Sequence, residues 1–158
     1  NWVMLSIDDE KVFVSKDFVS IKYKLKSAVS FKESDSSSSS DSGNGSMVSY
    51  AMQFLGNRYV WGGTSLTNGT DCSGFTMGIY RHFGISIPRT SAAQASASRS
   101  VKSSEVRPGD LFFYGSGHVS HVAMYIGGGK IIHASNARDG IKISNAYYRK
   151  PLKIGRFS

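Results

Sequence analysis

The chain has 158 residues, which is enough for one ordinary domain with an appendage and too few for two full domains. Hydrophobic residues make up 40% of the sequence and aromatic residues 12%, a composition typical of a globular chain rather than a disordered one. No apolar run approaches the roughly 18 residues of a membrane-spanning helix. The single cysteine excludes an internal disulfide and any zinc or iron–sulfur site built from several thiolates.

The charge is distributed unevenly along the chain. Residues 1–46 carry six lysines and seven acidic residues, whereas residues 47–158 carry 13 lysines and arginines against four acidic residues. Residues 47–158 therefore have a formal charge of +9. A domain with this charge is attracted to polyanions, such as nucleic acid or an anionic cell-wall polymer. Its basic residues are scattered and form no recognised nucleic-acid motif, so we expect no nucleic-acid partner. The four acidic residues show no pairing of the kind that a glycosidase needs.

The first third of the chain predicts β-structure followed by a linker. Alternating apolar residues predict strands over residues 2–7, 12–14 and 18–25. The run WVML…KVFVSKDFV is similar to the closing strands of bacterial Src-homology-3-like wall-binding domains, so we expect residues 1–33 to be the remnant of such a domain. Residues 34–46, SDSSSSSDSGNGS, contain no apolar side chain and predict a flexible linker.

Residues 47–158 predict an α+β domain. A first helix is expected after an N-cap at Ser46 and should end at Gly56. Its predicted buried stripe, at i, i+3, i+4 and i+7, consists of Val48, Ala51, Met52 and Leu55. A second helix is expected to begin at Asp71 or Cys72 and to end near residue 82. Strands are expected at residues 111–114, 121–126 and 130–134, and helices followed by consecutive strands indicate an antiparallel sheet covered by helices.

Cys72 is the first candidate for chemistry. It lies in T-D-C-S-G-F, where a loop meets the second predicted helix. A helix N-terminus favours the thiolate over the thiol. A lone cysteine is more often a small buried hydrophobic residue, but the neighbours of Cys72 are polar or very small. We therefore expect Cys72 to be a nucleophile.

A hairpin around three glycines brings two histidines together. If Gly127–Gly129 is a three-residue loop, Met124 pairs with Ile132, and His121 lies on the same face as His133, one diagonal step away. A loop of two or four residues would reverse the parity and separate the histidines. The apolar residues of the two strands gather on one face in the first register, which favours it.

Cys72, His121 and His133 then form a thiol-hydrolase constellation of nucleophile, base and orienting group. His118 is a rival base by proximity alone. Together with His121 and His133 it also forms a rival zinc site, although residues three apart on a strand point to opposite faces. His82, on the second predicted helix, is expected to be a packed helix histidine.

Four motifs in a fixed order carry a resemblance to a known family. They are Y-V-W-G-G-T…D-C-S-G-F (residues 59–75), I-P-R-T-S-x2-Q (87–94), V-R-P-G-D-L-x-F-F (106–113) and H-V-A-M-Y-I-G…K-I-I-H-A (121–134). Over essentially all of residues 47–158 the sequence resembles the NlpC family of bacterial cell-wall cysteine peptidases. The resemblance implies a papain-like α+β core, in which the nucleophile helix packs against the histidine-bearing strands of an antiparallel sheet.

The resemblance also implies roles for single residues. Cys72 matches the nucleophile, His121 the base and His133 the residue that orients the base. Tyr59 matches the tyrosine beside the nucleophile, which is thought to help the oxyanion site.

Four further residues are candidates for substrate binding. Asp71 and Ser73 match positions that face the substrate in related enzymes. Trp61, beside two glycines, either lines the groove or plugs the core. Ser120 directly precedes the candidate base.

These assignments imply a peptidoglycan endopeptidase that cleaves stem peptides at the bond between D-γ-glutamate and the diamino acid, with no metal or other cofactor. The sequence does not distinguish diaminopimelate from lysine. The alternative is a non-catalytic or autoinhibited wall-binding module. We expect a monomer that binds stem peptides and anionic wall polymers and that is secreted and cell-wall associated, with a signal sequence lying outside the sequence given.

Overall fold

A computed structural model describes residues 2–7, 10–15 and 42–157, and the chain divides into two compact units, residues 1–38 and 39–158. In the first unit, β1 (Trp2–Ile7) and β2 (Glu10–Ser15) form an antiparallel hairpin. Both strands confirm the β-character predicted for these segments. The third predicted strand and most of the serine-rich tract lie outside the described residues.

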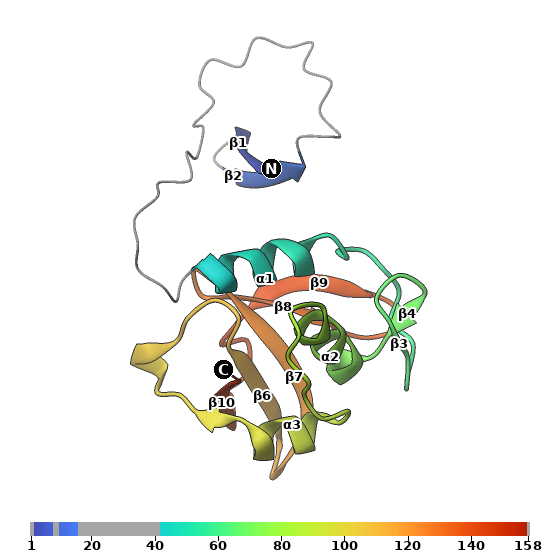
Figure 1. Ribbon diagram of the computed structural model, residues 1–158, viewed down its shortest axis with the longest axis vertical. Coiled ribbons are helices and arrows are strands. Elements are labelled where there is room, and N and C mark those ends of the chain that lie inside the picture. The colour runs from blue at the N-terminus through green and yellow to red at the C-terminus, as the bar shows by residue number, and fades with distance from the viewer. Residues whose placement is uncertain (1, 8–9, 16–41, 158) are drawn as a thin grey trace. The chain divides into compact units, whose positions relative to one another are not determined.

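In the described part of the second unit, three α-helices pack on an antiparallel sheet of six strands (Figure 1). The helices are α1 (Ser42–Met52), α2 (Cys72–His82) and α3 (Ser91–Ala97). In spatial order the strands are β5 (Arg99–Ser100), β10 (Lys153–Arg156), β6 (Leu111–Ser116), β7 (His118–Gly127), β8 (Lys130–Ala134) and β9 (Ile141–Asn145). Two short strands, β3 (Thr64–Ser65) and β4 (Gly69–Thr70), pair in the loop before α2. The predicted α+β class is confirmed. None of the helices in the described part of the chain is long and apolar enough to cross a membrane.

The central sheet is buried on both faces, which explains the uninterrupted apolar run of β6. Leu111 and Phe113 belong to the main core together with Phe75 of α2, and all three are completely buried. Phe112 and Tyr114, which alternate with them, enter a second cluster on the opposite face. Because α2 contacts both β7 and β8, this packing fixes the start of α2 relative to the strands that carry the histidines.

Helix α1 begins earlier than predicted. Its first residues, 42–46, lie in the tract predicted as a linker, and Ser46 is inside the helix rather than at its N-cap. The predicted stripe is correct only in part: Ala51 is buried, but Val48 and Met52 are half-buried and Leu55 is exposed, whereas Met47 in the helix and Phe54 just after it are buried. Tertiary packing accounts for both differences, because burial of Met47 in the core stabilises a helical turn that its serines and glycines would not form alone.

The β7–β8 hairpin differs from the predicted one at a single position. Met124 pairs with Ile132, as predicted, but Gly127 rather than Ile126 pairs with Lys130. Ile126 is therefore a bulged residue, and the loop contains two glycines. Glycines 127–129 have φ between +59° and +94°, which is favourable for glycine. One bulged residue plus a two-residue loop preserves the parity of a three-residue loop, so the two histidines still share a face.

Candidate active site

Cys72 is the first residue of α2, and the residue before it caps the helix. Asp71 Oδ1 accepts a hydrogen bond from the backbone N–H of Gly74 at 2.8 Å, and the Asp71 carbonyl accepts one from the N–H of Phe75 at 2.9 Å. The bond from Gly74 satisfies one of the free amides at the start of α2, and the bond from Phe75 is the first hydrogen bond within the helix. The backbone N–H groups of Cys72 and Ser73 instead hydrogen-bond to the Cys72 sulfur and lower the pKa of its thiol.

Arg89, in the loop before α3, holds the cap in place. Its guanidinium donates to Oδ1 and Oδ2 of Asp71 at 3.0 and 2.8 Å, and to Ser73 Oγ at 2.9 Å. Burial raises the pKa of Asp71, but hydrogen bonds from Arg89 and from the backbone N–H groups of Gly74 and Gly62 outweigh it, so the net pKa is lowered. Asp71 and Ser73, which the resemblance places facing the substrate, are thus both bound to Arg89. No role for Arg89 is predicted from the sequence, where its place in the I-P-R-T-S motif was the available signal.

Two glycines of the motifs are required by close backbone approach. A Cβ on Gly74 would overlap the carbonyl oxygen of Gly63, and a Cβ on Gly63 would lie 2.5 Å from the carbonyl oxygen of Gly69. The Gly63 carbonyl also accepts a hydrogen bond from the N–H of Asp71 at 3.1 Å. A side chain at either glycine would push the W-G-G loop away from the start of α2.

The Cys72 side chain is buried beside strand β7, at the residue that follows His121. Burial raises the pKa of Cys72, and the Asp71 carboxylate adds to this effect. The backbone N–H of Val122, with those of Ser73 and Cys72, acts in the opposite direction but does not outweigh burial. The predicted preference for the thiolate is therefore wrong. The resting group is a thiol, because desolvation exceeds the stabilisation that the helix N-terminus provides.

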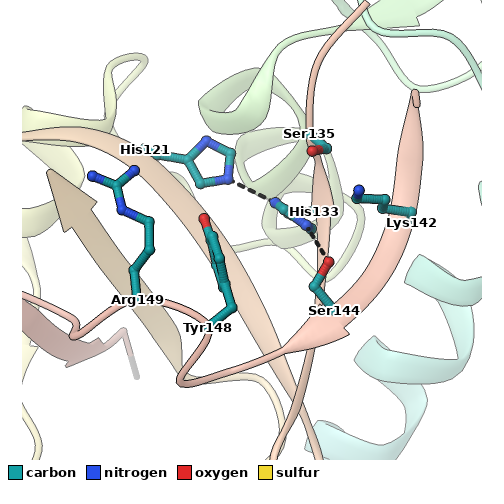
Figure 2. A pocket seen from close by; sticks show the side chains of 7 residues that line it. All are labelled: His121, His133, Ser135, Lys142, Ser144, Tyr148 and Arg149. Atoms are coloured by element: carbon teal, nitrogen blue, oxygen red, sulfur yellow. Dashed lines mark hydrogen bonds between the residues drawn. The ribbon is translucent and has the colours of Figure 1, made fainter. Parts of the chain in front are cut away.

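His121, His133 and a serine form a hydrogen-bonded chain of side chains (Figure 2). His121 Nε2 lies 2.7 Å from His133 Nδ1, which confirms the pairing predicted from the hairpin. His133 Nε2 lies 2.9 Å from Ser144 Oγ on β9, and Ser144 was not predicted because no strand was expected over these residues. His121 accepts a proton at Nδ1 only when its Nε2–H donates to His133, and His133 Nε2–H then donates to Ser144.

Burial lowers the pKa of both histidines. The pKa of His121 falls to about 4, through burial first and the positive charge of Arg149 second. The pKa of His133 falls to about 3, through burial and then through the neighbouring His121 and Lys142. Both rings are neutral at physiological pH, like the thiol of the candidate nucleophile.

These lowered pKa values predict a fold that acid destabilises. An unfolded histidine takes up a proton near pH 6.5, whereas folded His121 and His133 do so only near pH 4 and below. The unfolded chain therefore binds more protons in this window, and the free energy of unfolding should decrease as the pH falls from 6.5 to 4. Denaturant unfolding of the protein and of a His121→Gln/His133→Gln variant, measured at several pH values, checks this. The variant should show a flatter dependence, and equal slopes would contradict the burial of neutral rings.

The other predicted binding residues lie in different environments. Tyr59 is within electrostatic reach of the nucleophile: burial raises its pKa, and negative charge on Cys72 or Asp71 raises it further, so the phenol keeps its proton and can donate a hydrogen bond. Trp61 is 86% exposed and therefore does not plug the core. Ser120 is exposed on β7, one residue before His121.

The two remaining histidines do not join the pair. His118 is exposed at the start of β7. In the part of the chain that the structure describes, no group of three His, Cys, Asp or Glu side chains is arranged to hold a metal ion, so the rival zinc site is not assembled here. His82 is exposed at the end of α2 and stacks on Tyr50, with ring centroids 3.7 Å apart, as expected of a packed helix histidine.

Comparison with known proteins gives the family. The model of the NlpC/P60 family matches residues 56–154, a range that includes the cysteine, both paired histidines and the loops that hold the start of α2. The chain belongs to the NlpC/P60 family. The resemblance of its four motifs is thereby confirmed, and the family accounts for most of the second unit.

Three NlpC/P60 relatives illustrate the similarity. A probable endopeptidase p60 of Listeria innocua is 43% identical over 103 residues, which are 64% of this chain and 21% of that protein. A Bacillus cereus protein named gamma-D-glutamyl-L-lysine dipeptidyl-peptidase is 44% identical over 101 residues, 61% of this chain and 30% of that protein. The crystal structure of the NlpC/p60 domain of the peptidoglycan hydrolase SagA matches with a TM-score of 0.66 and 34% identity, over 72% of this chain and 98% of that domain. The chain thus spans less than a third of these two curated relatives.

Proposed function

We propose that the chain is a cysteine peptidase that hydrolyses peptidoglycan stem peptides between D-γ-glutamate and the diamino acid. The observation that carries the proposal is the position of the Cys72 sulfur, at a helix N-terminus and against the backbone N–H of Val122, directly beyond His121. The hydrogen bond from His121 to His133 holds the second group that such a reaction needs. The name of the Bacillus cereus relative, a gamma-D-glutamyl-L-lysine dipeptidyl-peptidase, and the description of SagA as a peptidoglycan hydrolase support this choice of substrate.

The first half of the reaction forms a thioester. The neutral thiol of Cys72 gives its proton to Nδ1 of His121 as the sulfur attacks the amide carbonyl carbon. The backbone N–H of Cys72 and the hydroxyl of Tyr59 stabilise the oxyanion that forms. His121, now an imidazolium held by His133, then protonates the departing amine as the C–N bond breaks.

The second half releases the acyl product. Neutral His121 takes a proton from a water molecule, and the resulting hydroxide attacks the thioester carbonyl. The C–S bond breaks, the sulfur recovers a proton from His121, and the product leaves as a carboxylic acid that gives its proton to solvent. Each proton is passed through Nδ1, so the hydrogen bond at Nε2 stays intact throughout.

Thiol-directed inhibition tests this proposal. The protein should release new free amino groups from purified sacculi, and prior alkylation with iodoacetamide should stop the release, whereas a chelator should leave it unchanged. Release that survives alkylation, or that is lost with a chelator, would refute a thiol mechanism.

Burial of the Cys72 thiol favours a second candidate, an autoinhibited or non-catalytic module that binds the wall. Such a module would bind sacculi without releasing amines.

We propose that residues 1–33 are the remnant of a Src-homology-3-like wall-binding domain and that the tract beyond them, up to the start of α1, is a flexible linker. The β1–β2 hairpin supports the first assignment, and the composition of the tract supports the second. We also propose that the protein is secreted and wall-associated, because its proposed substrate lies in the wall, and that it acts as a monomer.

The positive charge of residues 47–158 predicts salt-sensitive retention on the wall. The Debye length falls from about 10 Å at 0.1 M salt to about 3 Å at 1 M, so contacts between exposed cations and wall polyanions should be screened. Salt should therefore release the protein from intact sacculi and leave cleavage of a short soluble stem peptide nearly unchanged. Pelleting and peptide-cleavage titrations measure the two effects, and salt-indifferent pelleting would point to specific glycan or peptide recognition instead.

A further inference from the structure

A cavity of about 330 Å³ lies beside the histidine pair (Figure 2). His121 and His133 line one side of it, and Tyr148 and Arg149, from the segment after β9, extend towards His121 from another. Ligand cavities commonly range from about 300 to 1,000 Å³, so this one suits a short peptide fragment rather than a glycan strand.

The cavity is positively charged. None of its lining residues is acidic, and two of them, Lys142 and Arg149, are cationic. Lys142 is partly neutralised, because its Nζ lies 2.7 Å from Asp139 Oδ2. Arg149 is exposed and has neither a hydrogen bond nor an ion pair within residues 43–157. An unpaired guanidinium can bind a carboxylate through two parallel hydrogen bonds.

The position of the cavity indicates which part of a substrate would enter it. In the proposed reaction His121 protonates the leaving amine, so the fragment that carries this amine must lie against His121. The cavity is lined by both His121 and Arg149, and Cys72 is not among its lining residues. A leaving amino acid therefore has its own carboxyl group close to the cavity.

We propose that Arg149 binds a free carboxylate of the leaving fragment, and that the enzyme consequently prefers stem peptides whose diamino acid ends in a carboxylate. This inference rests on the proposed peptidase function. The charge of Arg149 also lowers the pKa of His121, so a bound carboxylate would offset that effect and make His121 a stronger base when the substrate is in place.

Two matched peptides test the inference: L-Ala–γ-D-Glu–L-Lys with a free C-terminal carboxylate, and the same peptide as its C-terminal amide. The protein should cleave the acid at least tenfold more efficiently, by kcat/KM, than the amide. Arg149→Gln should lower kcat/KM for the acid by about 10–100-fold, the usual worth of a charged hydrogen bond, and change that for the amide by less than about threefold. Lys150→Gln removes the same charge from the next exposed residue, which does not line the cavity, and should preserve the preference.

Each other outcome overturns the inference in a recognisable way. Equal losses for both peptides in Arg149→Gln would mean that Arg149 only supports the structure. Equal cleavage of the two peptides by the unmodified protein would mean that no carboxylate is recognised. If Arg149→Gln binds sacculi more weakly but keeps the preference for the acid peptide, Arg149 binds wall polyanions rather than the leaving fragment. Failure to cleave either peptide, or the same pair with diaminopimelate in place of lysine, would contradict the proposed function itself.

Discussion

Replacing Cys72 by alanine should abolish stem-peptide hydrolysis and leave the protein folded. Without the sulfur no thioester can form, so we expect a loss of about 10⁴-fold or more in kcat. The stability cost should be small, about 1 kcal/mol, because the side chain is short and the cap made by Asp71 and Arg89 uses no atom of it. Amine release from a stem peptide and thermal unfolding measure the two effects.

A Cys72→Ser variant is the matched control for packing. Serine is nearly the same size, so its melting temperature should equal that of the unmodified protein, and its activity should still be lost because a hydroxyl is a much weaker nucleophile without further activation. Residual activity of more than a few per cent in Cys72→Ala would show that another residue performs the attack.

The histidines should separate into a base, a positioning residue and bystanders. His121→Asn should lower kcat by about 10³–10⁴-fold, the usual contribution of a positioned general acid and base. His133→Asn should cost less, about 10–100-fold, because it acts through His121. Ser144→Ala should cost less again, and His82→Ala and His118→Ala should have no measurable effect. Single-turnover kinetics on one stem peptide compare all five variants.

The acid limb of the pH–rate profile distinguishes positioning from mere structural support. Loss of His133 or Ser144 alters the partner of His121 Nε2, so the pH at which activity falls should shift in these variants and not in His82→Ala. A large loss of activity in His118→Ala, together with inhibition by a chelator, would instead indicate that the histidines bind a catalytic metal ion.

Local sequence signals were sufficient for the parts of the fold that carry the histidines and the nucleophile. The start of α2 was predictable because Asp71 is a good N-cap and the apolar spacing of Phe75 and Ile79 is helical. The pairing of His121 and His133 was predictable because strand parity depends only on the loop and on the apolar alternation around it. The bulge at Ile126 compensated for the shorter loop, so the prediction of adjacent histidines survived.

The remaining features depend on contacts between distant segments. Arg89 and Ser144 reach the site from a loop and a strand that no local pattern connects to Cys72 or His133. The pKa of the thiol depends on its burial under β7, which composition cannot reveal, and burial reversed the direction expected from the helix terminus alone. The early start of α1 likewise depends on the core that receives Met47.

The most direct test of the central claim is the mass of the products formed from L-Ala–γ-D-Glu–L-Lys. The account predicts two products, L-Ala–γ-D-Glu and free L-Lys, which together gain one water molecule, and it predicts neither product with Cys72→Ala. Cleavage at the L-Ala–D-Glu bond, or the same products from the alanine variant, would contradict it.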